Sequence, residues 1–248
     1  MSHRVVVCTV AYGGWYRNGV ARMIQEFERH SPGIELQAWM NVLPPGARRM
    51  EENGYDYTGY ASKPWALKYA LDSGADIALL LDAAFYPIRS IHPMLDYIAQ
   101  IGYYLCDNGN MLGDWCSDKF LEQHVWMQGG NRMSESRKRE HARTIREVSS
   151  YAVGVNRHNP AAMQAAESWA LRCCNPGVVC GPHTATGFEG RNIGPVSSDA
   201  AVRGHRHDQS ALSALAYECD LTELCQRPRF TAYLGSETEQ TVLVNRGM

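Results

Sequence analysis

The sequence predicts an α/β fold with a mainly parallel, twisted sheet and helices on both of its faces. Apolar runs typical of strands buried on both faces alternate with segments whose apolar residues recur at helical spacing. The first half repeats the order strand, helix, strand, helix, strand, helix, strand, which favours right-handed βαβ units. A chain of 248 residues with 45% apolar residues can bury one large core, so we expect a single domain over residues 1–248.

The first three elements follow from apolar runs and breaker residues. Residues 5–10 (VVVCTV) form an uninterrupted apolar run, which predicts a buried strand that ends before Gly13 and Gly14. Apolar residues at helical spacing predict a helix over residues 17–30. Ser31-Pro32-Gly33 ends this helix, and the next strand is predicted over residues 34–40.

The rest of the first half is predicted from similar signals. A polar loop rich in tyrosine comes first, and Ser62 is the expected N-cap of the next helix, with Pro64 in its first turn. The predicted loop, helix, strand, helix and strand cover residues 44–59, 62–74, 76–81, 92–101 and 102–106.

The second half is less regular. Basic and acidic residues are interleaved over residues 135–147, which indicates a solvated helix face. The segment 175–202 is rich in glycine and proline and is expected to form loops around a cleft. The other predicted elements are a strand, two helices and a last strand over residues 150–156, 160–172, 208–217 and 241–245.

Composition limits the classes of function. The net charge of −2 gives no support to a broad nucleic-acid surface. No run approaches the roughly 18 apolar residues of a membrane span, and the N-terminus lacks the pattern of a secretory leader. We therefore expect the cytoplasm of a bacterium or of a virus-infected cell, where the eight cysteines stay reduced.

Two places near predicted strand ends could bind a ligand. Thr9, Ala11 and Tyr12 end the first strand, and the two glycines that follow would let the backbone approach a ligand, although a simple tight turn explains them equally well. Lys63 at a helix start is poorly placed against the helix dipole unless a phosphate binds there. The alternative is an exposed lysine.

Two further places carry acidic and imidazole groups. Asp82 follows the most apolar strand, where a carboxylate is costly without a partner or ligand, unless it only caps a turn. The run 204–210 (GHRHDQS) precedes a helix, and in an extended segment His205 and His207 point to the same side. They could bind metal or phosphate, or carry protons. Asp208 as a helix N-cap is the alternative.

These places, in this order, resemble the GT-A glycosyltransferases, and most closely retaining members of the glycogenin and lipopolysaccharide galactosyltransferase kind. The resemblance covers residues 5 to about 220. The runs GHRHDQSALSAL and VLVNRGM also resemble bacterial and phage glycosyltransferase-like proteins. The segments that carry the resemblance are Ser62-Lys63-Pro64-Trp65, Leu81-Asp82-Ala83-Ala84, Tyr86-Pro87-Ile88-Arg89, the strand and helix over 151–169, and Asp208-Gln209-Ser210 with the helix after it.

The resemblance implies roles for the predicted site residues. Thr9, Ala11 and Tyr12 would line a nucleotide pocket, Lys63 would meet phosphate, and Asp82 would hold ribose or a metal ion. The predicted catalytic residues, facing sugar and acceptor, are Asp208 and Gln209. The other predicted nucleotide-sugar contacts are Asp107, Asn108, His205, Arg206 and His207.

One position departs from the family pattern. The second carboxylate of the Asp-x-Asp signature is replaced by Ala84, so a complete pair for a divalent cation is missing. Asp82 could still bind Mn²⁺ or Mg²⁺ with help from a histidine and the diphosphate. Alternatively, Lys63, Arg206 and the histidines neutralise the diphosphate without a metal.

The resemblance therefore predicts a glycosyltransferase that moves a hexose from a nucleoside diphosphate sugar, with UDP as the expected nucleotide, to an acceptor hydroxyl. The acceptor could be a saccharide or a small molecule. The alternatives are a phage-type enzyme that glycosylates modified DNA bases, a nucleotidyltransferase on a similar sheet, and a non-catalytic nucleotide-sugar-binding protein.

Overall fold

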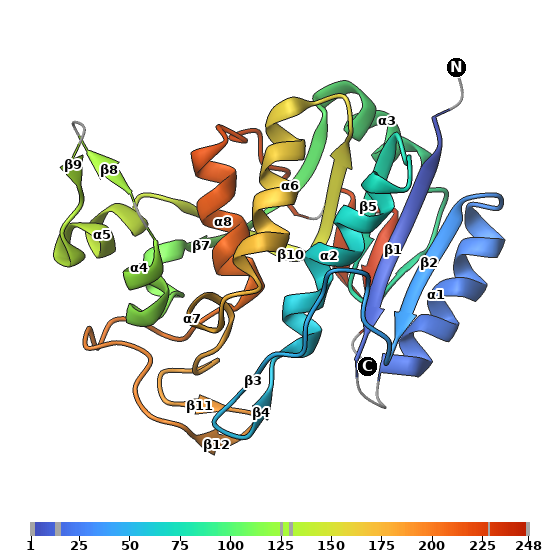
Figure 1. Ribbon diagram of the computed structural model, residues 1–248. Coiled ribbons are helices and arrows are strands. Elements are labelled where there is room, and N and C mark those ends of the chain that lie inside the picture. Colours follow the sequence, from blue (N-terminus) through green and yellow to red (C-terminus); the bar gives the residue numbers. More distant parts are fainter. Residues whose placement is uncertain (1–2, 13–15, 125, 129–130, 228, 247–248) are drawn as a thin grey trace.

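A five-stranded sheet in the order β2-β1-β5-β10-β7 forms the centre of the molecule. In that order its strands span Glu35–Met40, Val5–Ala11, Ile77–Leu81, Arg146–Asn156 and Tyr103–Met111. β1 pairs in parallel with β2 and β5, whereas β10 runs antiparallel to β5 and β7. Four strands thus share one direction, which confirms the mainly parallel sheet (Figure 1). The computed structural model describes residues 3–12, 16–124, 126–128, 131–227 and 229–246.

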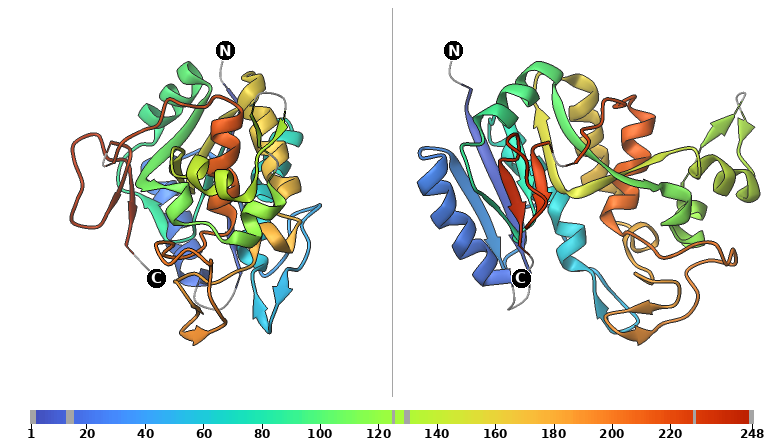
Figure 2. Two further views of the ribbon diagram at one scale, coloured as in Figure 1. Left: turned by 90° about the vertical axis from the view of Figure 1, so that its left-hand side faces the viewer. Right: turned by 180° about the vertical axis from the view of Figure 1, so that it is seen from behind.

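Helices cover both faces of this sheet, as predicted. One face carries α2 (Thr58–Asp72), α6 (Pro160–Arg172) and α8 (Asp208–Glu218), and the other carries α1 (Tyr16–His30) and α3 (His92–Ile101) (Figures 1 and 2). A small sheet in the order β13-β14-β6 adds to the second face. Its strands span Thr231–Tyr233, Leu243–Asn245 and Phe85–Pro87.

The strand β5 shows why both faces have to be covered. Its Leu80 packs in the cluster with α2, α6 and α8, whereas Leu79 and Leu81 pack in the cluster with α1 and α3. Successive side chains of a strand point to opposite faces, so a strand that is apolar at every position is stable only between two covering layers. Asp82 is the first polar residue after β5 and leaves the core at the carboxyl end of the strand.

Short elements surround the carboxyl ends of the parallel strands. The hairpins β3-β4 and β11-β12 lie side by side there, with the rings of Tyr55 and Phe188 5.5 Å apart (Figure 1). α4, α5 and the hairpin β8-β9 lie at the end of the molecule opposite α1 (Figures 1 and 2). The strands of these hairpins are β3 (Glu51–Glu52), β4 (Tyr55–Asp56), β8 (Met127–Gln128), β9 (Asn131–Arg132), β11 (Gly187–Phe188) and β12 (Arg191–Asn192). The short helices are η1, a 3-10 helix (Leu112–Asp114), α4 (Asp118–Gln123), α5 (Glu135–Ala142) and α7 (Pro176–Val179).

Most of the predicted elements are confirmed. α3 and α6 have the predicted bounds, and β1, α1, β2, β5 and α8 each differ by a single residue at one end. Periodicity located these elements because each lies in the core of the sheet or on one of its faces. The segment 175–202 consists mainly of loops, as expected, with α7 and the hairpin β11-β12 inside it.

The predicted start of α2 is wrong. The helix begins at Thr58, and Tyr57 is its N-cap residue, so Ser62 is not a cap and Pro64 is inside the helix. Met50 N donates to the Thr58 hydroxyl (2.9 Å), and Tyr57 N donates to Met50 O (2.7 Å). These contacts tie the first turn to the preceding loop, in which β3 and β4 were not predicted either. Lys63 therefore lies within α2 and not at its positive end.

The prediction for residues 135–147 is also wrong. α5 ends at Ala142, and β10 begins at Arg146, four residues before the predicted strand. The segment is not a solvated helix face, because Lys138, Arg139 and Glu147 are all buried. The strands β6, β8, β9 and β13 and the helix α4 were not predicted either, and β7 continues five residues beyond the predicted end at Cys106.

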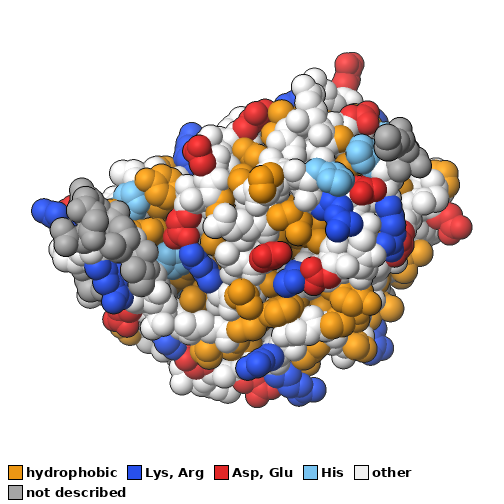
Figure 3. All heavy atoms as spheres, turned by 45° about the horizontal axis from the view of Figure 1, so that its top comes forward, with side chains coloured by type: hydrophobic (Ala, Val, Ile, Leu, Met, Phe, Trp, Pro, Cys, Tyr) orange, Lys and Arg blue, Asp and Glu red, His pale blue; other side chains and the backbone are white. Residues whose placement is uncertain are grey.

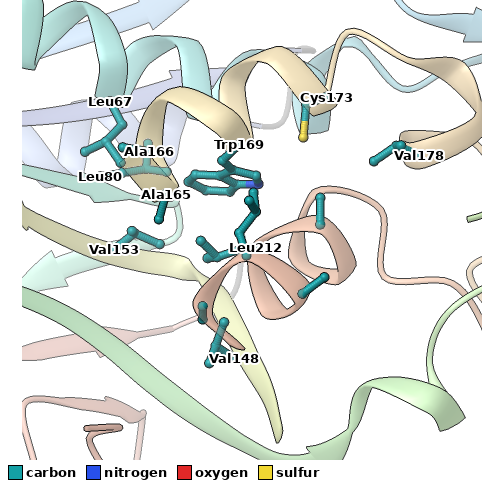
Figure 4. Close-up of a cluster of buried hydrophobic side chains, with 14 of the residues drawn as sticks. Leu67, Leu80, Val148, Val153, Ala165, Ala166, Trp169, Cys173, Val178 and Leu212 are labelled. Carbon is teal, nitrogen blue, oxygen red and sulfur yellow. The ribbon is translucent and has the colours of Figure 1, made fainter. Parts of the chain in front are cut away.

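Trp169 is the centre of the core between the sheet and its covering helices. The side chain is fully buried, and its Nε1 donates to Asp208 O at 2.8 Å. Figure 4 shows the indole from α6 lying against α8, with Leu212, Leu67 and Val153 around it. The core thus reaches from β10 to the first residue of α8, so it also fixes the place of Asp208.

Two statements from composition can be compared with the structure. All eight cysteines are free of disulfide bonds. No helix in the described segments is long and apolar enough to cross a membrane.

Leu212→Ala should lower the free energy of unfolding by about 2–5 kcal/mol, because the leucine is 2% exposed and its loss leaves a cavity beside Trp169. Leu171→Ala is the matched control, since this leucine is 63% exposed on α6 and its loss should change stability by less than about 0.5 kcal/mol. Urea unfolding of the two variants measures both values. Equal losses would contradict the core described above.

Candidate active site

A cavity of about 260 Å³ opens at the carboxyl ends of the parallel strands. This is the edge at which α/β sheets bind ligands. The first half of α2, the end of β5, the strands β7, β10 and β13, the start of α8 and the loops before α8 all supply side chains to it. Its lining consists of Tyr60, Lys63, Asp82, Asn108, Ser150, Tyr151, His183, Arg206, His207, Asp208, Gln209 and Tyr233.

Lys63 joins the two carboxylates of this cavity. Its Nζ lies 2.7 Å from Asp82 Oδ1 and 3.7 Å from Asp208 Oδ2. Asp82 is held at the end of β5, where its backbone N donates to Tyr151 O (2.8 Å). The lysine thus links α2, the end of β5 and the start of α8, which brings three of the predicted site residues together.

Burial and charge shift the pKa values of this group. Burial raises the pKa of Asp208 to about 6, because the attraction of Lys63 only partly offsets the lost hydration and the repulsion of Asp82. Burial alone would lower the pKa of Lys63, but the combined attraction of Asp208 and Asp82 outweighs it and raises that pKa. At neutral pH the cavity therefore holds an ammonium between two carboxylates, and Asp208 can change its protonation state near that pH.

Asp208 is the first residue of α8, and the N-cap position belongs to His207. The interpretation of Asp208 as the cap is therefore wrong. His207 has a φ of 52°, which a residue with a side chain rarely adopts. This backbone turn directs Asp208 toward Lys63 and Gln209 toward β10, where Gln209 Oε1 accepts from Ser150 N (3.3 Å).

The three histidines near the cavity are connected. The rings of His205 and His207 are 5.3 Å apart, so they lie close together as expected. Of these two, however, only His207 lines the cavity. His205 is fully buried, with Nε2 bonded to Val178 O (2.8 Å) and Nδ1 accepting from Ser117 N (3.4 Å). The prediction of a ligand contact by His205 is therefore not supported by its position, and burial lowers its pKa to about 4.

The first strand supplies little to this cavity. Thr9 and Ala11 are fully buried in β1, and Ala11 packs with Val20 and Ala83. Tyr12 is half-buried and comes near Gly59 at the start of α2. None of the three lines the cavity. The predicted glycine turn at Gly13 and Gly14 lies outside the described residues.

Asp107 and Asn108, which were both predicted to contact the ligand, differ in their positions relative to the cavity. Asp107 turns back on its own strand and accepts from Gly109 N (2.7 Å) and from Gln226 Nε2 (3.1 Å), so it does not reach the cavity. Asn108 does line the cavity. Its Nδ2 donates to Glu147 Oε2 (2.8 Å), and its Oδ1 accepts from Arg227 Nη2 (2.7 Å).

Three residues of this region were missed in the sequence. Glu147 is fully buried behind Asn108, and burial raises its pKa. Arg227 lies between Tyr151 and Tyr233, with its guanidinium carbon 4.8 Å and 5.1 Å from their ring centroids. His183 lines the cavity and contacts Arg206. Glu147 was hidden in a charged run, whereas no local signal marked Arg227.

The donor set does not fit a divalent cation well. Asp82 is the only carboxylate of the incomplete Asp-x-Asp pattern, and it is already paired with Lys63. The backbone carbonyl of Ala84, at the position of the missing carboxylate, accepts from Arg22 Nη2 (3.2 Å). Nowhere in the described parts of the chain do three His, Cys, Asp or Glu side chains gather as metal ligands.

A second cavity of about 580 Å³ adjoins the first. Tyr60 and His183 line both, so the two cavities are neighbours, and residues of the hairpin β11-β12 line the larger one. Polar and aromatic side chains, among them Thr186, Phe188 and Arg191, line the second cavity.

Comparisons with known proteins agree with this architecture. No protein-family model matches the chain, and no curated protein matches its sequence. A solved structure with a similar fold is the apo form of WbbM, a bifunctional glycosyltransferase, with a TM-score of 0.52 and 7% sequence identity. The match covers all of this chain and 46% of the other, so the chain spans less than half of that protein. The likeness shows that the α/β fold of this chain is one found in a glycosyltransferase.

Asp208→Asn should reveal the raised pKa through stability. The folded chain holds the Asp208 proton more tightly than the unfolded chain, because the pKa rises from 3.8 to about 6. Wild-type stability therefore falls as the pH rises through this range, by on the order of 3 kcal/mol once the group is ionised. The asparagine variant lacks this loss, so its stability relative to wild type should increase between about pH 4 and about pH 7. Urea unfolding at both pH values measures the change, and a constant difference would contradict it.

Proposed function

We propose that this chain is a glycosyltransferase that moves a hexose from a nucleoside diphosphate sugar, with UDP as the nucleotide, to an acceptor hydroxyl. The observation that carries the proposal is Lys63 between Asp82 and Asp208 in a cavity at the ligand-binding edge of the sheet. The glycosyltransferase-like fold supports it.

The reaction needs charge stabilisation at two places. The bond between the anomeric carbon and the diphosphate oxygen breaks, and its electron pair stays on the diphosphate. The acceptor oxygen bonds to the same carbon, and its proton leaves. Lys63 and Arg206 supply positive charge for the leaving diphosphate. Asp208, with a pKa of about 6, takes up the acceptor proton at neutral pH.

The lining of the two cavities supports a place for each ligand. Gln209 and Asn108 offer amide groups to sugar hydroxyls in the smaller cavity, next to Asp208. The larger cavity, with its hydroxyl, aromatic and charged side chains, receives the acceptor. Tyr60 and His183 line both, so the acceptor oxygen can reach the anomeric carbon.

A saccharide or small-molecule acceptor is favoured over modified DNA. The net charge of the chain is −2. Acidic and basic side chains are interspersed over the face shown in Figure 3. A DNA-binding face instead gathers lysine and arginine for contacts with phosphates. Migration of duplex DNA through a native gel should therefore be unchanged by the protein at low salt, and retardation there would favour the DNA-modifying alternative.

The donor can be identified by thermal unfolding with nucleoside diphosphates and nucleotide sugars. One UDP-sugar should stabilise the fold by about 2.7 kcal/mol at 100 times its Kd. Each ligand is tested with EDTA and with Mn²⁺. We expect stabilisation in EDTA, because Lys63 and Arg206 supply the positive charge. Stabilisation that needs Mn²⁺ would show that the proposed charge arrangement is wrong. If no nucleotide or nucleotide sugar stabilises the fold, the proposed function is contradicted.

Asp208→Asn and Asp82→Asn should each reduce kcat at least about 100-fold while leaving the chain folded, because each removes a charge that faces the reacting groups. UDP release from the stabilising UDP-sugar, with water as acceptor, measures this before the acceptor is known. Asp72→Asn on the exposed side of α2 is the control and should retain activity. Near-normal activity of both site variants would contradict the proposal, and ligand binding without release in wild type would favour the non-catalytic binder.

A further inference from the structure

Arg206 is the cationic side chain of the cavity that no carboxylate holds directly. Its guanidinium carbon lies 3.8 Å from the ring centroid of Trp115, and its backbone N donates to Trp115 O (3.1 Å). The side chain is hydrogen-bonded to His183, with Nη1 2.7 Å from His183 Nε2. Nε has no hydrogen-bond partner among the described residues. A charged donor group thus lies in the cavity wall, and one of its N–H groups is buried without an acceptor in the described part of the chain.

The protons of the neighbouring histidines are fixed by the two ends of a hydrogen-bonded chain. A guanidinium can only donate, so His183 Nε2 must accept. A carbonyl can only accept, so His207 Nδ1 donates to Val179 O (2.8 Å). Between them, His183 Nδ1 lies 3.3 Å from His207 Nε2 and donates to it. The chain therefore runs from Arg206 to Val179 with one proton on each imidazole.

This arrangement requires both imidazoles to be neutral, and their surroundings keep them so. Burial lowers the pKa of His183, and the charge of Arg206 lowers it further. Burial also lowers the pKa of His207, with a smaller contribution from His205. The rings of Tyr57, Tyr60 and Phe188 surround His207 and offer no charge that would favour an imidazolium.

We propose that His183, held in turn by His207, is a positioning residue that fixes the Arg206 guanidinium against Trp115 as a binding group for a phosphate of the ligand. The proposal rests on the proposed function in taking that phosphate to be part of a nucleoside diphosphate. Arginine suits this role because its planar group of N–H donors matches phosphate oxygens. A guanidinium already immobilised loses less freedom on binding than a free side chain.

His183→Leu and His183→Gln separate positioning from simple packing. Leucine removes both hydrogen bonds, whereas glutamine can accept from Arg206 and donate to His207. We expect His183→Leu to raise the Kd for inorganic pyrophosphate and for UDP about 10-fold or more. His183→Gln should remain within about 3-fold of wild type. Isothermal titration calorimetry measures Kd, and urea unfolding verifies that each variant is folded.

A double-mutant cycle tests whether His183 acts through Arg206. In an Arg206→Gln background, His183→Leu should cause no further loss of affinity, because the group that it positions is gone. Arg229→Gln is the matched control. Arg229 also stacks on aromatic rings, at 4.8 Å from the centroid of Tyr97, but it lines a different cavity, so its loss should leave both Kd values unchanged.

The outcomes distinguish this inference from the proposed function. Equal losses from His183→Leu in both backgrounds, or failure of the folded glutamine variant to restore affinity, would overturn the positioning role while the glycosyltransferase proposal stands. Pyrophosphate binding that depends on both residues, without binding of any nucleotide sugar, would support the anion site and overturn the proposed function. Absence of binding by pyrophosphate and by UDP would overturn both.

Discussion

The ion pair of Lys63 with Asp82 and Asp208 is the constraint on which the rest of the site depends. Charges that lose their hydration are stable only when they are paired, so α2, the end of β5 and the start of α8 must keep their relative positions. The neutral core supports the same arrangement, since Trp169 donates to the backbone of Asp208. A ligand with two phosphates would meet a site whose charges are already close to balance, and its binding must therefore exchange one set of ion pairs for another.

Local sequence signals were sufficient for most of the segments that form the central sheet or pack on it. The strand β5 could be located because a strand between two layers is apolar at every position, and the helix over residues 160–172 because its apolar residues recur on one side. The start of α2 could not be located in this way. Ser62-Lys63-Pro64 has the composition of a helix start, but Tyr57 and Thr58 bond to Met50, and that contact begins the helix one turn earlier. The strand β10 was placed too late because Glu147 looks like a surface residue until Asn108 and Asn110 are brought beside it.

The site residues also fall into those that local sequence signals indicated and those that depend on long-range contacts. Asp82 was found because it follows a buried strand, where a carboxylate is costly, and Asp208 and Gln209 because they belong to a run of imidazole and polar side chains before a predicted helix. His183 and Arg227 come from loops, and their neighbours in space are 23 and more residues away along the chain. Conversely, His205 is of a residue type that often binds ligands, but its imidazole is hydrogen-bonded to the backbone of Val178 and Ser117. The polar run over residues 204–210 therefore indicated where the site lies. Which of its residues face the cavity and which support it depends on long-range packing, which the run does not show.

The partners that hold Arg206 and Asn108 add little net charge to the cavity, and this has a physical reason. Each residue that faces the cavity needs a partner to hold its orientation, yet a charged partner would weaken the charge that the ligand is to meet. Arg206 is held by a neutral imidazole and an indole, and Asn108 by a carboxylate and a guanidinium of opposite charge. Both arrangements fix direction while adding little net charge. Interactions aimed at a ligand are worth most when the donors do not have to reorient as it binds, so such partners strengthen the site without contacting the ligand themselves.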